Sequence, residues 1–178
     1  RSEQCLLGSE RDRLKFAARR EYIMACNWKA YVDNYLDGGY HVPRLHSGLA
    51  GQLDLDQYTT EVFDQFAIQT CESPDGGASA TPAPTADFAE RIGQGALYAW
   101  VYPNLMINRY GPMMDVNWVV PMDAGRTKVV FDYYFQEQID EEFIARAIQA
   151  SHNVQEEDVA ICESVQRGLA SGTFARQR

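Results

Sequence analysis

Cysteine is scarce in this sequence, and its few copies are scattered. The chain has four cysteines among 178 residues, and none belongs to a Cys-x2-Cys or Cys-x-His pattern. They are Cys5, Cys26, Cys71 and Cys162. This distribution argues against a disulfide framework and is typical of free thiols in a reducing compartment.

Long apolar runs are also missing. No stretch approaches the roughly 20 apolar residues of a membrane span, and the first residues lack the apolar core of a signal peptide. The chain opens on Arg1 rather than Met, so we expect a segment excised from a longer protein. The expected location is the cytoplasm, or an organelle stroma if a transit peptide has been removed, with no membrane association.

Positive charge is in short supply. Sixteen Lys and Arg face 25 Asp and Glu, which gives a formal net charge of −9. No basic cluster lies among aromatic residues in a way that would follow phosphates, so nucleic acid is not expected as a partner. The acidic balance is compatible with ordinary solubility and weakly favours a cationic ligand.

Aromatic residues, in contrast, are abundant. The chain has 3 Trp, 10 Tyr and 8 Phe, and 46% of its residues are hydrophobic. This inventory favours one folded domain with a β-containing core or a ring-lined pocket.

The first half of the chain contains a few segments with a readable period. Residues 19–26 are compatible with a short strand, and residues 30–36 have the apolar spacing of a short helix that ends at Gly38 and Gly39. Residues 58–70 alternate as one half-buried strand. One side of that strand carries Val62, Phe66 and Ile68, and the other carries Glu61, Gln65 and Gln69.

Three further strands are predicted in the second half, over residues 96–106, 116–121 and 128–136. The last has one apolar face. That face consists of Val129, Phe131, Tyr133 and Phe135. Between the two halves, residues 73–87 are rich in Gly, Pro, Ser and Ala, and we expect them to form a mobile loop.

A helix in two pieces is predicted over residues 140–168. Asp140 is its expected N-cap, and a break is expected near residues 151–153. The apolar stripe of the first piece is Phe143, Ala147 and Ile148; that of the second is Val159, Cys162, Val165 and Leu169. Antiparallel strands followed by a long terminal helix predict an α+β fold, in which the helix packs in the curve of the sheet and encloses a pocket.

Two of the three histidines lie close together, at His41 and His46. On a helix this spacing separates them by roughly 140°, so both can reach one metal ion if the backbone bends. Pro43, Gly38 and Gly39 favour such a bend. Imidazole suits zinc, copper and iron, whereas the alternative is a pair of exposed or hydrogen-bonded histidines without a metal.

The surroundings of these histidines resemble a known family. Residues 33–41 read Asp-Asn-Tyr-Leu-Asp-Gly-Gly-Tyr-His, and together with His46 they resemble the iron-binding stretch of Rieske non-haem iron oxygenase large subunits. Residues 102–114 and 157–169 are similar to two further blocks of that family. The sequence most resembles the choline monooxygenase branch, whose members oxidise quaternary ammonium compounds. The implied fold is of the helix-grip, START/Bet v 1-like type.

The resemblance implies a mononuclear Fe(II) site. Its ligands would be His41, His46 and Asp158. We expect Asp158 to open the second piece of the terminal helix, where a carboxylate interacts favourably with the helix N-terminus. Glu156 and Glu157 lie beside it, and the residues alone do not separate the three acids.

The resemblance also implies catalytic roles for Asn34 and Asp37. Family members use an acid before the first histidine to couple the iron to the Rieske cluster of an adjacent subunit. The usual spacing is acid-x2-His, whereas this chain has Asp37-x3-His41, and a count without a gap places Gly38 there. The alternative role of Asp37 is that of a turn residue.

The cluster-binding pattern of the family, Cys-x-His followed by Cys-x2-His, is absent. We therefore expect a 2Fe-2S cluster only on a separate or missing domain, and no turnover by this chain alone. Residues 1–20 would continue from that Rieske domain, and residues 21–178 would form the catalytic domain. The implied partners are the cluster domain of a neighbouring subunit in a homotrimer, and a reductase.

The implied reaction is O2-dependent hydroxylation of a small substrate, such as choline or a betaine. Aromatic faces would hold its cation. The candidates are Trp100, Tyr102, Tyr110, Trp118 and Tyr133, unless they are sheet-core residues. Two other hypotheses remain: a metal-free ligand-binding module of the same fold, and a hydrolase with zinc at the same three ligands.

Limited proteolysis should cut residues 73–87 before any other internal segment, because their composition offers almost no apolar anchor. Mass spectrometry of the first fragments would locate the cut. An early cut elsewhere that leaves this segment whole would contradict the prediction.

Overall fold

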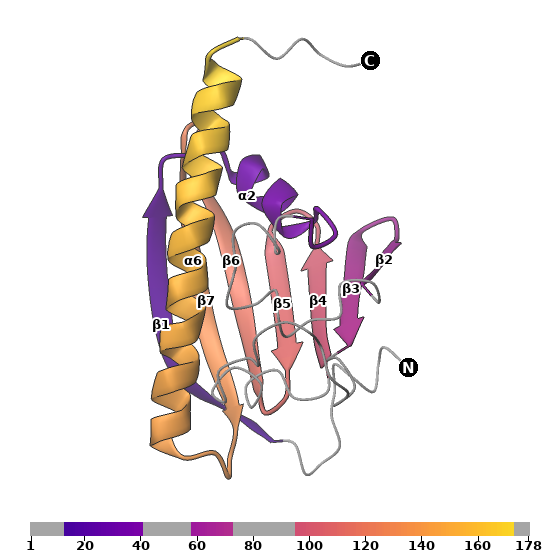
Figure 1. Cartoon of the computed structure of the whole chain (residues 1–178), viewed down its shortest axis with the longest axis vertical. Helices are drawn as coiled ribbons and strands as arrows, with labels where there is room; N and C mark the ends of the chain where they lie inside the picture. The colour runs from indigo at the N-terminus through magenta and orange to yellow at the C-terminus, as the bar shows by residue number, and fades with distance from the viewer. Residues whose placement is uncertain (1–12, 41–57, 73–94, 173–178) are drawn as a thin grey trace, which may run out of the picture.

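The computed structural model describes residues 13–40, 58–72 and 95–172. Within them, seven strands form one antiparallel sheet with the order β1-β7-β6-β5-β4-β3-β2 (Figure 1). The strands are β1 (Leu14–Met24), β2 (Thr59–Val62), β3 (Phe66–Glu72), β4 (Gly95–Val101), β5 (Leu105–Tyr110), β6 (Met113–Asp123) and β7 (Arg126–Gln136). The helices are α2 (Trp28–Tyr35) and α6 (Glu141–Ala170).

The sheet has an inner face that packs against α6. On β7, Val129, Phe131, Tyr133 and Phe135 are all buried, as predicted. The Phe135 ring meets Phe143 of α6 edge-on at 6.3 Å between centroids. Figure 1 shows α6 lying along β7 and β1, with α2 beside it. The predicted antiparallel sheet wrapped around a long C-terminal helix is therefore confirmed.

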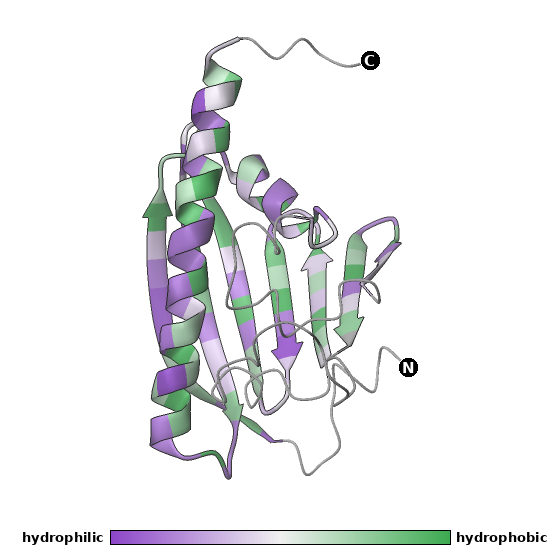
Figure 2. Ribbon diagram, viewed as in Figure 1, coloured by the Kyte–Doolittle hydropathy of each residue, from purple (hydrophilic) through white to green (hydrophobic). Residues whose placement is uncertain are grey.

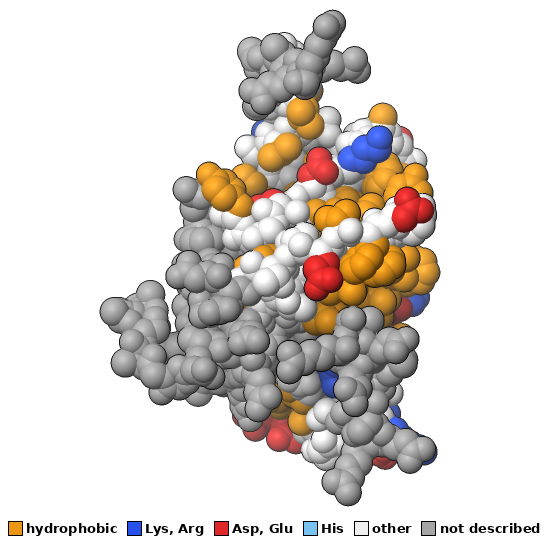
Figure 3. Space-filling model, turned by 90° about the vertical axis from the view of Figure 1, so that its right-hand side faces the viewer, with side chains coloured by type: hydrophobic (Ala, Val, Ile, Leu, Met, Phe, Trp, Pro, Cys, Tyr) orange, Lys and Arg blue, Asp and Glu red, His pale blue; other side chains and the backbone are white. Residues whose placement is uncertain are grey.

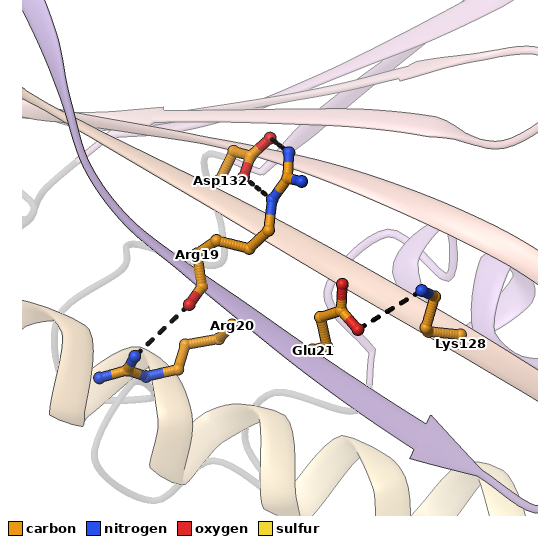
Figure 4. A network of polar contacts seen from close by, with 5 residues as sticks. All are labelled: Arg19, Arg20, Glu21, Lys128 and Asp132. Carbon is orange, nitrogen blue, oxygen red and sulfur yellow. Dashed lines mark hydrogen bonds and ion pairs between the residues drawn. The ribbon is translucent and has the colours of Figure 1, made fainter.

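The outer face of the sheet carries charged pairs. Arg19 of β1 donates two hydrogen bonds of 2.6 Å to the two carboxylate oxygens of Asp132 on β7 (Figure 4). On the same face, Lys128 lies 3.4 Å from Glu21. Along strands and α6, hydrophilic residues alternate with hydrophobic ones (Figure 2), which is the pattern of elements that bury one face.

The first strand is longer than predicted. β1 pairs with β7 from Leu14 to Met24, with one register shift between Phe16 and Ala18. As an edge strand, β1 buries few of its side chains, so its sequence lacks the apolar alternation that would have predicted its first half. The sheet therefore begins before residue 21, the expected start of the catalytic domain.

Residues 58–70 were predicted as one strand, and that prediction is wrong. They form the hairpin of β2 and β3, closed by a 2.8 Å bond from Phe63 N to Phe66 O. The turn changes which side chains point inward, so Val62 is 78% exposed and Gln69 is only 1% exposed. Hydrophobic side chains gather on the face of the molecule that Figure 3 shows. Within the hairpin, the rings of Phe63 and Phe66 stack at 4.4 Å between centroids.

The predicted strand over residues 96–106 is also two strands, β4 and β5. A turn separates them, fixed by bonds from Tyr102 N to Gln65 O (2.9 Å) and from Asn104 Nδ2 to Val119 O (2.8 Å). Pro103 and Asn104 in this turn are residue types that turns favour, and the prediction of a single strand passed over that signal. β6 extends beyond the predicted 116–121 at both ends.

The terminal helix is continuous, whereas two pieces were predicted. α6 runs for 30 residues without a break near residues 151–153. The polar side chains there have partners on the sheet: Ser151 Oγ lies 3.0 Å from Tyr133 Oη, and His152 Nδ1 lies 3.2 Å from Tyr22 Oη. Asp158 therefore lies in mid-helix rather than at a helix N-terminus.

The two apolar stripes of α6 differ in burial. Phe143, Ala147 and Ile148 are buried as predicted, and so is Cys162. Val165 and Leu169 are exposed, because the last turns extend past the edge of the packed region. Neither α2 nor α6 combines the length and apolar character needed to cross a bilayer.

The N-terminus of α6 is capped as predicted. Asp140 Oδ1 accepts a 2.7 Å hydrogen bond from Phe143 N. Asp140→Ala should lower the free energy of unfolding by about 0.5–2 kcal/mol, because it leaves that N–H without its acceptor. Asp140→Asn keeps an acceptor and should lose less in urea unfolding. Equal losses in the two variants would argue against the cap.

Candidate functional site

Two polar contacts join α2 to α6. Asn34 Nδ2 donates a 2.8 Å hydrogen bond to Asp158 Oδ1. Tyr31 Oη donates a 2.8 Å hydrogen bond to Gln155 Oε1. Tyr31 and Asn34 are three positions apart on α2, and their partners are three positions apart on α6. Both contacts therefore lie on facing turns of the two helices.

The start of α2 is held by the C-terminal half of α6. Asn27 caps α2 by accepting from Lys29 N at 3.0 Å. The backbone N–H of Asn27 donates to Gln166 Oε1 (2.8 Å), and that of Ala25 donates to Glu163 Oε1 (2.9 Å). These hydrogen bonds attach the start of α2 to α6, and they help to fix the position of Asn34 relative to Asp158.

The end of α2 is held by the inner face of the sheet. Tyr35 Oη donates to Asn108 Oδ1 at 2.7 Å, and Asn108 Nδ2 donates to Asp115 Oδ2 at 2.6 Å. Gln69 Nε2 donates to the Tyr35 carbonyl at 2.8 Å. A chain of hydrogen bonds thus leads from α2 to a buried carboxylate on β6.

Burial and negative charge keep two tyrosines protonated. Burial raises the pKa of Tyr31 well above its usual value, and the charges of Asp158 and Asp115 raise it further. Burial also raises the pKa of Tyr35, with a smaller contribution from Asp115. Both phenols therefore stay protonated, and able to donate a hydrogen bond, at a pH where an exposed tyrosine ionises.

Asp37 lies in a turn just after α2. Its Oδ1 accepts a 3.0 Å hydrogen bond from Gly39 N. Gly39 has φ +79°, and a Cβ on it would lie 3.1 Å from the Tyr58 ring, so glycine is required for both reasons. Asp37 therefore stabilises this turn through one of its carboxylate oxygens.

Of the three expected metal ligands, Asp158 is the one that lies within the described residues. His41 and His46 lie outside the described residues. Among residues 13–40, 58–72 and 95–172, no three His, Cys, Asp or Glu side chains are grouped closely enough to hold a metal ion. Asp158 differs from its neighbours, because it is half-buried against Asn34 while Glu156 and Glu157 are exposed.

The aromatic candidates lie in different places. Tyr110 and Tyr133 are buried on the inner face, and Trp100 is half-buried on the same face, where it pairs with Met106. Tyr102 is 60% exposed in the turn after β4. Trp118 is 45% exposed on the outer face. Side chains alternate along β6, and Asp115, Asn117 and Val119 are the ones that point inward. Trp118 is thus separated by the sheet from Asn34 and Asp158.

Sequence reasoning missed several polar groups of the interior, namely Tyr31, Asp115, Asn117 and Gln155. Asp115 and Asn117 alternate with exposed or half-buried residues on β6, between buried Met113 and Val119. That alternation was the signal that would have found them, but only a shorter strand was predicted. Gln155 was missed because a helix break was expected just before it.

Comparison with known proteins identifies the family. Residues 11–178 match the model of the ring hydroxylating alpha subunit (catalytic domain). The chain belongs to this family. The ring-hydroxylating alpha-subunit assignment confirms the resemblance seen in the sequence, and it identifies the chain as the catalytic part of such a subunit.

Relatives of this alpha-subunit domain include oxygenases of ammonium compounds. The chain is 51% identical over 167 residues to a chloroplastic choline monooxygenase of Arabidopsis thaliana, covering 93% of this chain and 38% of that protein. It is 31% identical over 167 residues to a carnitine monooxygenase oxygenase subunit of Acinetobacter pittii, covering 92% and 43%. The chain thus spans about two fifths of these relatives.

Solved structures have the same fold. A quaternary ammonium Rieske monooxygenase superposes with a TM-score of 0.74 at 29% identity, covering 88% of this chain and 41% of that one. Dicamba monooxygenase superposes with a TM-score of 0.67 at 18% identity, covering 93% and 53%, and supports the fold alone.

Tyr31→Phe should lower the free energy of unfolding by about 1–3 kcal/mol, because it leaves the buried Gln155 Oε1 without its donor. Tyr102→Phe removes the same hydroxyl from an exposed ring and should cost less than about 0.5 kcal/mol. Urea unfolding of both variants measures the difference. A Tyr31→Phe variant as stable as Tyr102→Phe would contradict the role assigned to the Tyr31–Gln155 contact.

Proposed function

We propose that this chain is the mononuclear Fe(II) domain of a Rieske-type oxygenase that hydroxylates a small quaternary ammonium compound, choline or a betaine. The observation that carries the proposal is the Asn34–Asp158 contact. It holds the expected carboxylate ligand in a chain that is 51% identical to a choline monooxygenase. Carnitine monooxygenase among the relatives supports the same substrate class.

The proposed ligand set fits iron. Two imidazoles, from His41 and His46, and the carboxylate of Asp158 are the donors of the facial arrangement in non-haem Fe(II) oxygenases. The half-buried position of Asp158 favours it over Glu156 and Glu157 as the third donor.

The chain contributes positioning, and iron would supply the oxidising chemistry with O2. Asn34 restrains the carboxylate of Asp158 through its amide N–H, as partners of metal ligands commonly do. Tyr31 and Gln155 fix the spacing of the two helices at the same level. Tyr31 and Gln155 are buried between α2, α6 and the inner face of the sheet.

Electrons would come from outside this chain. We propose that a 2Fe-2S cluster on the Rieske domain of a neighbouring subunit, in a homotrimer served by a reductase, delivers them through Asp37. We place the start of the catalytic domain before Leu14, since β1 begins there and the family match begins at residue 11. A stromal location is proposed because the plant relatives are chloroplastic.

The family match supports this oxygenase over the two other hypotheses. A metal-free ligand-binding module would not need the restrained Asp158, and a zinc hydrolase has no counterpart among the relatives described above. The metal and the substrate are therefore tested separately.

His41→Ala or His46→Ala should abolish binding of Fe(II) and leave the circular dichroism spectrum unchanged, because each removes one of three proposed ligands. The matched control is His152→Ala. His152 lies on the same helix as Asp158, but its ring stacks on Tyr22 and its Nδ1 lies 3.2 Å from the Tyr22 hydroxyl. Full iron occupancy in either of the first two variants would overturn the ligand assignment.

The iron-loaded chain should bind choline more tightly than its neutral isostere 3,3-dimethylbutanol. Each aromatic face contributes roughly 0.5–2 kcal/mol toward a desolvated cation. Isothermal titration calorimetry with both ligands measures the preference. Tighter binding of the neutral isostere would defeat the quaternary ammonium assignment and leave the iron site untouched.

A further inference from the structure

The inner face of the sheet carries a buried carboxylate in addition to Asp158. Asp115 lies on β6 between Asn108 of β5 and Tyr133 of β7, and it is 1% exposed. Burial of an ionised carboxylate is costly, and its neighbours along this face of β6 include the apolar Met113 and Val119. A carboxylate at this position therefore calls for a functional explanation.

Aromatic rings lie around Asp115. Tyr133 is its neighbour across the strand pair, and Tyr35 is linked to it through Asn108. Tyr98 and Tyr110 meet edge-on at 5.8 Å on the adjoining strands, and Tyr98 also meets Tyr35 at 6.2 Å. Rings around a carboxylate are the combination that suits a quaternary ammonium group, which has no N–H to donate.

Asp115 and Asp158 both affect Tyr31, a buried residue of α2. The charges of both raise the pKa of Tyr31, after the larger effect of burial. Tyr31 in turn holds Gln155, which lies one turn before Asp158 on α6. Asp115 on the sheet and Asp158 on α6 are also each connected to α2 by hydrogen bonds, the first through Asn108 and Tyr35 and the second through Asn34.

Two buried amides nearby have unused hydrogen-bonding atoms. Asn117 and Gln155 are each 2% exposed. Within the described part of the chain, Asn117 Oδ1 and Gln155 Nε2 have no hydrogen-bond partner. Leaving such atoms unsatisfied is costly, so an acceptor and a donor that stay buried here point to a ligand with a polar group.

We propose that Asp115 is a specificity-determining residue whose carboxylate faces the ammonium group of the substrate and selects cations over neutral molecules of the same shape. Asn117 Oδ1 can accept a hydrogen bond from a hydroxyl on the same substrate, and Gln155 Nε2 can donate one to a hydroxyl or a carboxylate. This inference rests on the proposed function, since it assumes a quaternary ammonium substrate, and it adds the residue that supplies the counter-charge.

The test compares two ligands in three proteins. Calorimetry with choline and with 3,3-dimethylbutanol is run on the iron-loaded wild type, on Asp115→Asn and on Asp132→Asn. Asparagine keeps an oxygen that accepts from Asn108. Asp132 is the matched control, because it is 6% exposed on the neighbouring strand but lies on the outer face, paired with Arg19.

The expected result is that Asp115→Asn weakens choline binding about tenfold or more, the scale of one lost charge interaction in a partly screened site. Binding of 3,3-dimethylbutanol and the iron content should change little. Asp132→Asn should keep the wild-type preference for choline. If Asp115→Asn does not fold, Asp115→Thr is used, since threonine suits a strand and keeps an oxygen.

The outcomes separate the two proposals. A wild type that prefers choline, with the same preference in a folded neutral variant at position 115, would overturn the role of Asp115 and leave the proposed function standing. A wild type without any preference for choline would overturn the quaternary ammonium assignment, and the role of Asp115 with it.

Discussion

The contact between α2 and α6 is the constraint on which the proposed site depends. α6 crosses the inner face of the sheet, and α2 is tied to it by Asn34–Asp158 and Tyr31–Gln155. Each hydrogen bond contributes only about 0.5–1.5 kcal/mol net. Their value lies in geometry, because two contacts on facing turns fix both the distance and the rotation of one helix relative to the other. A restrained carboxylate is what a metal site requires.

The interior of this domain is more polar than stability alone would favour. Asp115, Asn117 and Gln155 are buried where apolar residues would pack without cost from desolvation. Tyr35 and Asn108 satisfy part of this polarity through the hydrogen bonds that end on Asp115. Under the proposed function, these groups are in place before a charged, oxygenated substrate arrives, which would lower the cost of reorganisation on binding.

Sequence reasoning located the family and the main architecture, but it failed where tertiary contacts override local patterns. The apolar alternation of β7 and the Asp140 cap are local signals, and both were predicted correctly. Ser151 indicated a break in α6, yet its hydroxyl has a buried partner on the sheet, so the helix continues. Val62 was assigned to a buried face because the apolar alternation continues through the turn, in which only Asp64 is a residue type that turns favour. Trp118 was offered as a substrate contact, and only the register of β6 places it on the outer face.

The most direct measurement is anaerobic reconstitution of the chain with Fe(II) and, in parallel, with Zn(II), followed by metal analysis and spectroscopy of the ferrous site. The account predicts stoichiometric Fe(II) with open coordination positions, and loss of that binding in Asp158→Ala. Preferential tight binding of zinc would instead support a hydrolase. Failure to bind any metal would contradict the iron site and favour a ligand-binding module on the same fold.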